Sequence, residues 1–253
     1  MSATDTLKIK RRSSRLDMGE DGRRAWRVVE DALVCSPREC AVILCDVWDR
    51  HWCRGAVERL DSMLPRMADM VRVARAKGIL IIHAPSETMK YYENTKARKR
   101  AAGVPRTHVP RTSQHDEPPL PIDLSNGGCD TSDNFGAVGQ RVWSRQSEKI
   151  PIDDDSDAIT DDGEEVYSLL KKESRSHLFF AGVHTNICIL NRSFGIKNMV
   201  RWGVDVTLIR DLTDAMYDPQ DRPYVLHDIG TELVVSYIEK HWCPTTLSEE
   251  FLR

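Results

Sequence analysis

Several features that would assign a protein to a class at once are missing from this chain. No apolar run approaches the roughly 20 residues that a membrane-spanning helix needs. The basic N-terminal residues are not followed by the apolar segment of a secretory signal. The net charge of −3 gives no general electrostatic reason to expect nucleic acid or a membrane as a partner. A soluble cytoplasmic protein is the default expectation.

The cysteines show no framework of disulfides. Their number is odd, no C-x-x-C pair occurs, and nothing else indicates export, so reduced thiols are expected. The seven are Cys35, Cys40, Cys45, Cys53, Cys129, Cys188 and Cys243. Most of them should be small buried hydrophobic residues, and the question is whether one differs.

What the chain does contain is an alternation of short apolar runs and helical patterns. Apolar runs with the profile of buried strands occur at 41–47, 79–84, 177–183 and 204–210. Helical spacing or composition lies between and after them, at 60–74, 91–100, 163–173, 187–202 and 222–240. This alternation predicts an α/β fold with a mostly parallel sheet covered on both faces.

The organisation along the chain is expected to have three parts. Residues 1–40 form an N-terminal extension that contains a probable β-hairpin, and residues 41–240 form the main domain. Residues 241–253 remain as a C-terminal tail. Within the main domain, residues 103–139 are an irregular insertion rich in proline; a lid with apolar residues to pack is preferred, and a flexible loop is the alternative.

Chemistry-bearing residues follow the predicted strands. Ligands bind beyond the carboxyl ends of the strands in an open parallel sheet. Asp46, His83, His184 and Asp211 each stand at such an end, and Cys188 follows His184 closely. If the strands are parallel neighbours, Asp46 and Cys188 emerge at the same edge.

Cys188 has two interpretations. If Thr185 or Asn186 caps the next helix, Cys188 lies in its first turn, where free N–H groups stabilise a thiolate and an oxyanion. The alternative is a buried apolar cysteine of a core helix. Asp46 is either the general base for this thiol or a carboxylate that caps a nearby turn.

Four segments together resemble the isochorismatase-like cysteine hydrolases, which include nicotinamidases and N-carbamoylsarcosine amidohydrolases. They are VILCDVWD at 42–49, RVARAKGILIIHA at 72–84, AGVHTNIC at 181–188 and LIRDLTDA at 208–215. The resemblance implies a three-layer α/β/α, Rossmann-like domain over 41–240 with an Asp–Lys–Cys catalytic triad. It also implies a homo-oligomer and no organic cofactor.

The resemblance assigns roles to single residues. Asp46 and Cys188 match the family's acid and nucleophile. The Val183–His184 peptide matches a cis bond that would aim the N–H of His184, with that of Cys188, at the oxyanion. Lys149 is the only lysine in the region expected for the third member of the triad.

The context around Lys149 departs from the family pattern. The usual Lys-x-x-x-Ser-x-Phe is missing and acidic residues take its place. Arg145 or Gln146 is the alternative third member, and an incomplete triad is another. No metal site is expected, because Asp49 and His51 alone do not make one.

The predicted function is hydrolysis of a C–N bond in a small amide, ureido or related substrate. Trp48, His51, His83 and the insertion are expected to line the substrate pocket. Two other classes stay open: an inactive binding or regulatory protein on the same fold, and a thiol redox protein in which Cys45 or Cys53 resolves Cys188.

Overall fold

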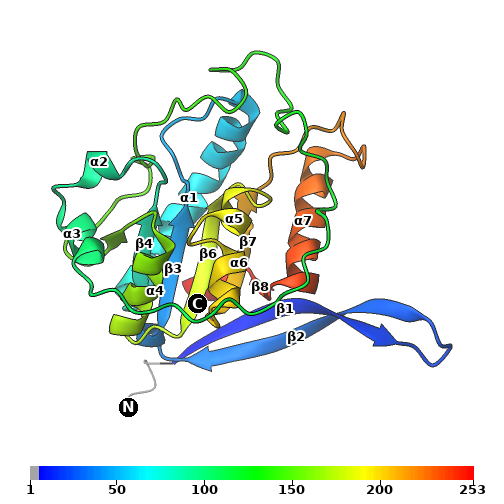
Figure 1. Ribbon diagram of the computed structural model, residues 1–253, viewed down its shortest axis with the longest axis horizontal. Helices are drawn as coiled ribbons and strands as arrows, with labels where there is room; N and C mark the ends of the chain where they lie inside the picture. Colours follow the sequence, from blue (N-terminus) through cyan, green and yellow to red (C-terminus); the bar gives the residue numbers. More distant parts are fainter. Residues whose placement is uncertain (1–5) are drawn as a thin grey trace.

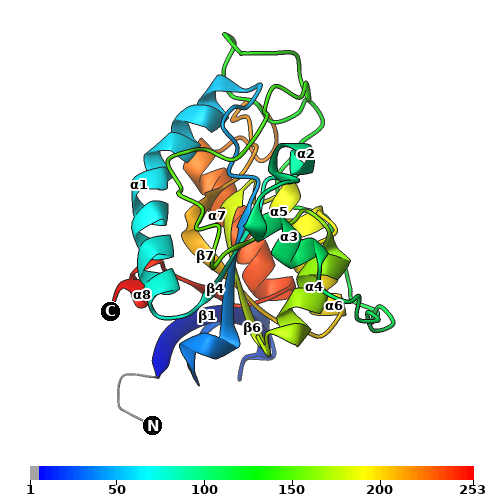
Figure 2. The same cartoon turned by 90° about the vertical axis from the view of Figure 1, so that its left-hand side faces the viewer.

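The computed structural model describes residues 6–253 as one eight-stranded sheet between two layers of helices (Figures 1 and 2). The strands follow the order β2-β1-β8-β7-β6-β3-β4-β5. Their bounds are β1 Leu7–Met18, β2 Arg24–Cys35, β3 Cys40–Cys45, β4 Leu80–Ala84, β5 Ala158–Ile159, β6 His177–Val183, β7 Asp205–Asp214 and β8 Thr245–Thr246. All pairs from β8 to β5 are parallel, and β1 pairs antiparallel with β2 and β8. The predicted α/β class with a mostly parallel sheet is confirmed.

The helices divide between the two faces of the sheet. They are α1 Arg54–Ala76, α2 Met89–Tyr92, α3 Lys96–Ala102, α4 Gly163–Lys172, α5 Cys188–Asn191, α6 Ile196–Arg201, α7 His227–His241 and α8 Glu249–Leu252. Figure 2 shows α1 and α8 on one side, and α4 to α7 on the other. Among the described residues, no helix is long and apolar enough to cross a membrane.

Strand β3 shows why this sheet is buried on both sides. Its residues alternate between the two cores: Ile43 packs in the core beneath α4 to α7, and Val42 and Leu44 pack in the core beneath α1. Because both faces meet apolar side chains, the strand has no polar position until Asp46. The sheet therefore delivers Asp46 at its carboxyl end.

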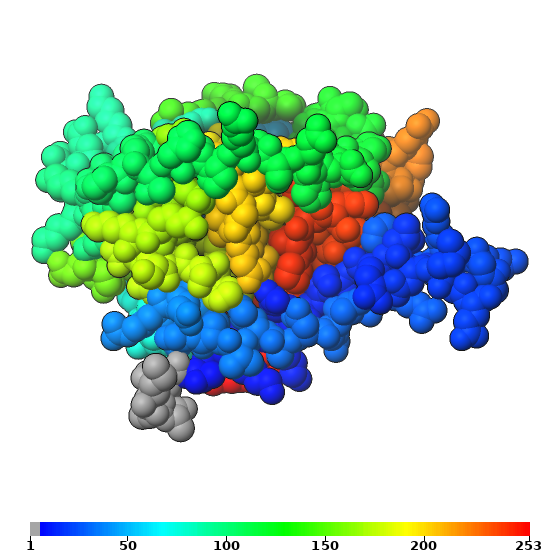
Figure 3. All heavy atoms as spheres, turned by 60° about the horizontal axis from the view of Figure 1, so that its bottom comes forward, coloured from blue at the N-terminus to red at the C-terminus, as the bar shows by residue number. Residues whose placement is uncertain are grey.

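The N-terminal hairpin is confirmed, but the expected C-terminal tail is not a tail. Strands β1 and β2 pair over their full lengths, and part of the hairpin extends beyond the body of the protein (Figure 3). Strand β8 lies between β1 and β7 and so joins the hairpin to the parallel part of the sheet. Helix α8 packs against α1 through Phe251, which is fully buried. Strand β8 has only two residues, which is too short for an alternating pattern to be recognised in the sequence.

Phe251→Ala should destabilise the protein, because Phe251 fills the core and meets Phe179 edge to face at 5.0 Å. We expect the free energy of unfolding to fall by about 3–5 kcal/mol in denaturant titrations. The neighbouring Leu252 is 44% exposed, so Leu252→Ala serves as the matched control and should change stability by at most about 0.5 kcal/mol. Equal effects of the two substitutions would refute the packing argument.

The insertion 103–139 runs over two parts of the protein, and its role as a lid stays a prediction. Its first half crosses the helices as a strap, visible in Figure 3: Thr107 bonds to α4, Ser113 to α6, and the carbonyl of Pro118 accepts from Tyr237 of α7. Its second half runs over the carboxyl end of the sheet (Figure 1). There Cys129 forms a disulfide with Cys53, which corrects the expectation of reduced thiols.

The helix predicted at 187–202 is two short helices. Helix α5 ends at Asn191, Arg192 takes an extended ψ of 159°, and α6 begins after Gly195. A Cβ on Gly195 would lie 2.9 Å from the carbonyl oxygen of Arg192, so the turn between the helices favours glycine. The break places Arg192 outside the helix, which matters for the site.

Candidate active site

Asp46 is fully buried at the carboxyl end of β3 and is held by two donors. The Ser86 N–H donates to Oδ1 at 2.8 Å, and Arg192 Nε donates to Oδ2 at 3.0 Å. Burial raises the pKa of Asp46, whereas the Arg192 charge and the bonds from Cys188 and Ser86 act in the opposite direction. These donors favour an ionised carboxylate that is ready to accept a proton.

Cys188 opens α5 beside this carboxylate and is 6% exposed. The Asp46 carboxylate is close enough to act on the pKa of the Cys188 thiol, and Arg192 links the two residues through its bonds to Asp46 Oδ2 and to the Cys188 carbonyl. The expected fall in thiol pKa is wrong: burial raises the pKa of Cys188 well above its usual value, and the Asp46 charge adds to this. The resting thiol is therefore neutral, and the pKa of the neighbouring Asp46 is raised by burial and held down in part by Arg192 and Ser86.

Arg192 supplies the cation that the sequence did not locate. It lies four residues after Cys188, and its N–H donates to the Cys188 carbonyl at 3.0 Å across one helical turn. The guanidinium thereby reaches back to Asp46, and it also lies within 5.9 Å of the Trp48 ring centre. Burial acts to lower the pKa of Arg192, but the charge of Asp46 and its hydrogen bond to Arg192 contribute to a net rise, so Arg192 stays a fixed cation.

Lys149 is not brought to Asp46, which corrects the predicted triad. Its Nζ pairs with Asp61 at 2.9 Å, and its side chain is 59% exposed. The two alternatives also point elsewhere: Arg145 bonds Tyr91, and Gln146 is buried against the carbonyl of Ile150. A basic residue four positions after the cysteine was the available signal for Arg192, because residues i and i+4 share a helix face.

The Val183–His184 peptide is cis, as the resemblance implied. The His184 backbone N–H acts to lower the pKa of the Cys188 thiol, against the larger effect of burial. The His184 carbonyl accepts from Ile187 and Ile189, at 3.0 and 3.2 Å. Among the described residues, no acceptor bonds the Cys188 N–H. Within residues 6–253, the Cys188 N–H is thus without a backbone acceptor at the start of α5.

Neither Thr185 nor Asn186 caps α5 as predicted. Thr185 pairs its hydroxyl with Thr213 at 2.7 Å, and the Asn186 amide exchanges two bonds with the backbone of Met216. These bonds tie the loop after β6 to the end of β7. They therefore fix the position of the turn that carries Cys188.

A cavity of about 260 Å³ borders the cis peptide. Its lining includes apolar, aromatic and polar residues. The lining consists of Trp48, Asp49, Arg50, His51, Ala56, Val57, Leu60, Asp61, Ser147, Lys149, Val183 and His184. Trp48 and His51 are pocket walls as predicted, and Lys149 is at the cavity although it does not reach Asp46.

Trp143, which follows the insertion, packs against the aromatic wall of the cavity. Trp48 stacks on Trp143 with ring centres 4.1 Å apart, and His51 meets His184 edge to face at 4.8 Å. Burial lowers the pKa of His51 to about 4 and the pKa of His184 to about 3. Both imidazoles are neutral at pH 7, so this wall carries no charge.

His83 does not line the cavity, which corrects the prediction. It is fully buried, with Nδ1 at 2.9 Å from Gln146 and Nε2 at 3.0 Å from Asp157. Asp157 also pairs with Arg75 at 2.6 Å. Burial opposes the charge of Asp157, but the bonds from His83 and Arg75 outweigh it and lower the pKa to about 2. This is a structural network.

Asp157→Asn should therefore lower stability in a pH-dependent way. A carboxylate whose pKa is lowered on folding stabilises the fold above its unfolded pKa, and this contribution is lost as the pH falls. We expect a loss of about 2 kcal/mol at pH 7 that disappears between about pH 4 and 2. Urea titrations of both proteins at pH 7 and pH 3 measure it; a difference independent of pH would contradict the pairing.

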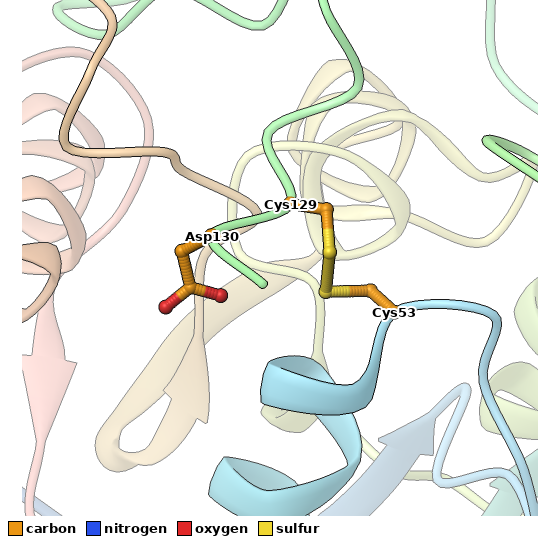
Figure 4. A group of neighbouring side chains, drawn as sticks. All are labelled: Cys53, Cys129 and Asp130. Carbon is orange, nitrogen blue, oxygen red and sulfur yellow. A yellow bond between two sulfur atoms is a disulfide. The ribbon is translucent and has the colours of Figure 1, made fainter. Parts of the chain in front are cut away.

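Asp49 and His51, the two candidate metal ligands, are both hydrogen-bonded within the protein. Asp49 accepts from the Ser144 N–H and hydroxyl, and His51 Nδ1 accepts from the Cys53 N–H. Among the described residues, one donor cluster exists: Cys53, Cys129 and Asp130 (Figure 4). Its two sulfurs are joined to each other, so they are not free as thiolate ligands.

Comparison with known proteins places the fold. No protein-family model and no curated protein matches the chain. A crystal structure of a cysteine hydrolase from Pseudomonas syringae pv. phaseolicola 1448A matches 87% of this chain and 93% of its own, at 14% identity and a TM-score of 0.52. An isochorismatase from Pseudomonas putida KT2440 (85% and 91% covered, 11% identity, TM-score 0.48) and an isochorismatase family protein from Desulfovibrio vulgaris subsp. vulgaris str. Hildenborough (79% and 90%, 15%, 0.45) also match. The chain thus shares its α/β fold with the cysteine hydrolase from Pseudomonas syringae, which agrees with the predicted resemblance at the level of the fold.

Proposed function

We propose that the protein is a cysteine hydrolase that cleaves a C–N bond of a small amide or ureido compound through a covalent intermediate on Cys188. One observation carries the proposal. The buried Asp46 and Cys188 and the partly exposed Arg192 come from two separate segments and lie together as acid, thiol and fixed cation. Buried charges are costly unless they are paired, and here the pairing leaves the thiol proton beside a free acceptor position.

In the first half of the reaction, Asp46 takes the proton of the Cys188 thiol as the sulfur attacks the substrate carbonyl carbon. The tetrahedral adduct carries its negative charge on the former carbonyl oxygen. As the C–N bond breaks, the protonated Asp46 returns the proton to the leaving nitrogen. The products are an amine or ammonia and an acyl or carbamoyl group on Cys188.

In the second half, Asp46 removes a proton from a water molecule that attacks the bound acyl group. The adduct collapses, the C–S bond breaks, and the sulfur regains the proton from Asp46. The enzyme returns to a neutral thiol and an ionised carboxylate, and the acid is released. The N–H groups of His184 and Cys188 would hold the oxyanion in both halves.

Arg192 stabilises the negative charge both when it is on Asp46 and when it is on the Cys188 sulfur. A guanidinium does not lose its proton in proteins, so Arg192 takes no part in the transfer. Its charge favours ionised Asp46 in the resting state and favours the thiolate that forms as the proton moves. It thereby takes the role that the family resemblance gave to a lysine, and the poor match around Lys149 no longer supports an inactive protein.

The substrate is expected to enter the cavity beside the cis peptide. Its wall of Trp48, His51 and His184 is uncharged at pH 7, and its volume of about 260 Å³ fits a small molecule. Lys149 and Asp61 at the other side offer polar contacts. A small substrate with an uncharged amide or ureido end fits this lining. Assembly into a homo-oligomer remains a prediction.

The function is tested by incubating the protein with a panel of small amides and ureido compounds and measuring ammonia release. Intact-mass spectrometry of the same mixtures should detect the acyl or carbamoyl adduct. Cys188→Ser removes the nucleophile, whereas Cys243→Ser changes another buried thiol and is the matched control. Release that continues unchanged in Cys188→Ser would refute the mechanism.

A further inference from the structure

Two cysteines outside the active site face each other at the base of the hairpin. Cys35 ends β2 and Cys40 begins β3, and their sulfur atoms are 3.4 Å apart without being bonded. An S–S bond requires the sulfurs to approach by only a further ~1.4 Å. Asp46 lies about 20 Å away at the opposite end of β3, from the rise of an extended strand. The pair is therefore separate from the hydrolytic site.

The position of both thiols is fixed by the backbone. Cys35 is paired with Leu7 in the hairpin, and Cys40 is paired with His177 in the central sheet. The turn between them is closed by a capping box: the Ser36 N–H donates to Glu39 at 2.7 Å, and the Ser36 hydroxyl accepts from Arg38. The sulfurs are thus held in contact by folded structure on both sides.

The two thiols differ in environment, as an attacking and a resolving thiol do. Cys35 is partly exposed, whereas Cys40 is fully buried and directs its sulfur at the Ser36 carbonyl, 3.6 Å away. The hydrogen bond from Cys40 and the charge of His177 lower the pKa of Cys35 to about 7 against the effect of burial. The same bond and burial raise the pKa of Cys40. The accessible thiol is thus the one that ionises first.

We infer that Cys35 and Cys40 are a peroxide-sensitive dithiol, in which Cys35 is oxidised and Cys40 converts it to a disulfide. The Cys35 thiolate attacks one oxygen of hydrogen peroxide, the O–O bond breaks, and hydroxide leaves to become water with the thiol's proton. The Cys40 sulfur then attacks the sulfenic sulfur of Cys35. The S–O bond breaks, and the departing hydroxyl takes the Cys40 proton as a second water. Two thiols are oxidised and one peroxide is reduced.

The inference is tested by brief treatment of the native protein with hydrogen peroxide, alkylation of the remaining thiols, and tryptic mass spectrometry. Cleavage after arginine separates 28–38, which carries Cys35, from 39–50, which carries Cys40 and Cys45. We expect the two peptides to be joined, with fragment ions that place the bond on Cys40. Cys35 should react at least about tenfold faster than the buried Cys243.

Single substitutions separate the two roles. In Cys40→Ser, Cys35 should stop at the sulfenic acid, which dimedone traps, and no joined peptides should form. In Cys35→Ser, residue 40 should become no more reactive than Cys243. The inference is overturned if Cys35 in the native protein reacts no faster than Cys243, or if peroxide oxidises Cys35 while Cys40 remains fully open to alkylation after unfolding.

Discussion

Replacing Asp46 by asparagine should lower kcat/KM about 10³- to 10⁴-fold while the protein stays folded. Asparagine has the same shape and can still accept from the Ser86 N–H, but it cannot take the thiol proton. The pKa of the Cys188 thiol is raised by burial, so a negligible fraction is ionised without this base. The loss should appear in kcat, because the base acts on the reacting sulfur and not on substrate binding.

The matched control is Asp157→Asn, which also removes a buried carboxylate paired with an arginine. Asp157 contacts neither Cys188 nor the cavity, so kcat/KM should change by less than about twofold when measured below the unfolding transition. A thermal melt of each variant shows whether a loss of activity comes from unfolding or from slower catalysis. If Asp46→Asn retains more than about a tenth of the activity, Asp46 is not the base.

Part of the candidate site could be predicted from the sequence alone. The strands that end at Asp46 and precede Cys188 were predicted because their apolar runs are bounded by polar residues, and the sheet rule then places both at one edge. The thiol–carboxylate pair therefore follows from local pattern plus topology. The aromatic walls Trp48 and His51 follow in the same way, since they continue the loop after β3.

The missed features depend on contacts between distant segments or on local breaks. The disulfide joins residues 76 positions apart, and nothing in the sequence near Cys53 indicates Cys129. His83 ends a strand as expected, but Asp157 and Gln146 arrive from the far side of the insertion and bury it. Arg192 lies at the end of α5 and pairs with Asp46, so its place in the site depends on a contact between residues 146 positions apart.

Arg192→Ala should lower kcat/KM about 10²- to 10³-fold at pH 7, and the loss should depend on pH. Burial raises the pKa of Asp46 above its usual value, and the Arg192 charge limits this rise. Without it the pKa of Asp46 rises, and the ionised base forms only at higher pH. The acid limb of the pH–rate profile should therefore move upward, so that the loss is greater at pH 6 than at pH 8.

Two further variants make the assignment of Arg192 decisive. Arg192→Lys restores a charge but not the planar donor to Asp46 Oδ2. Its kcat/KM should therefore be about tenfold higher than that of Arg192→Ala, and its acid limb should lie closer to that of the native protein. Lys149→Ala removes the lysine first expected in this role. Because Lys149 pairs with Asp61 and is mostly exposed, it should lower kcat/KM by less than about tenfold and leave the acid limb in place. A larger loss in Lys149→Ala than in Arg192→Ala, with a shifted acid limb, would return the role to the lysine, since only the residue that neutralises the base can move its titration.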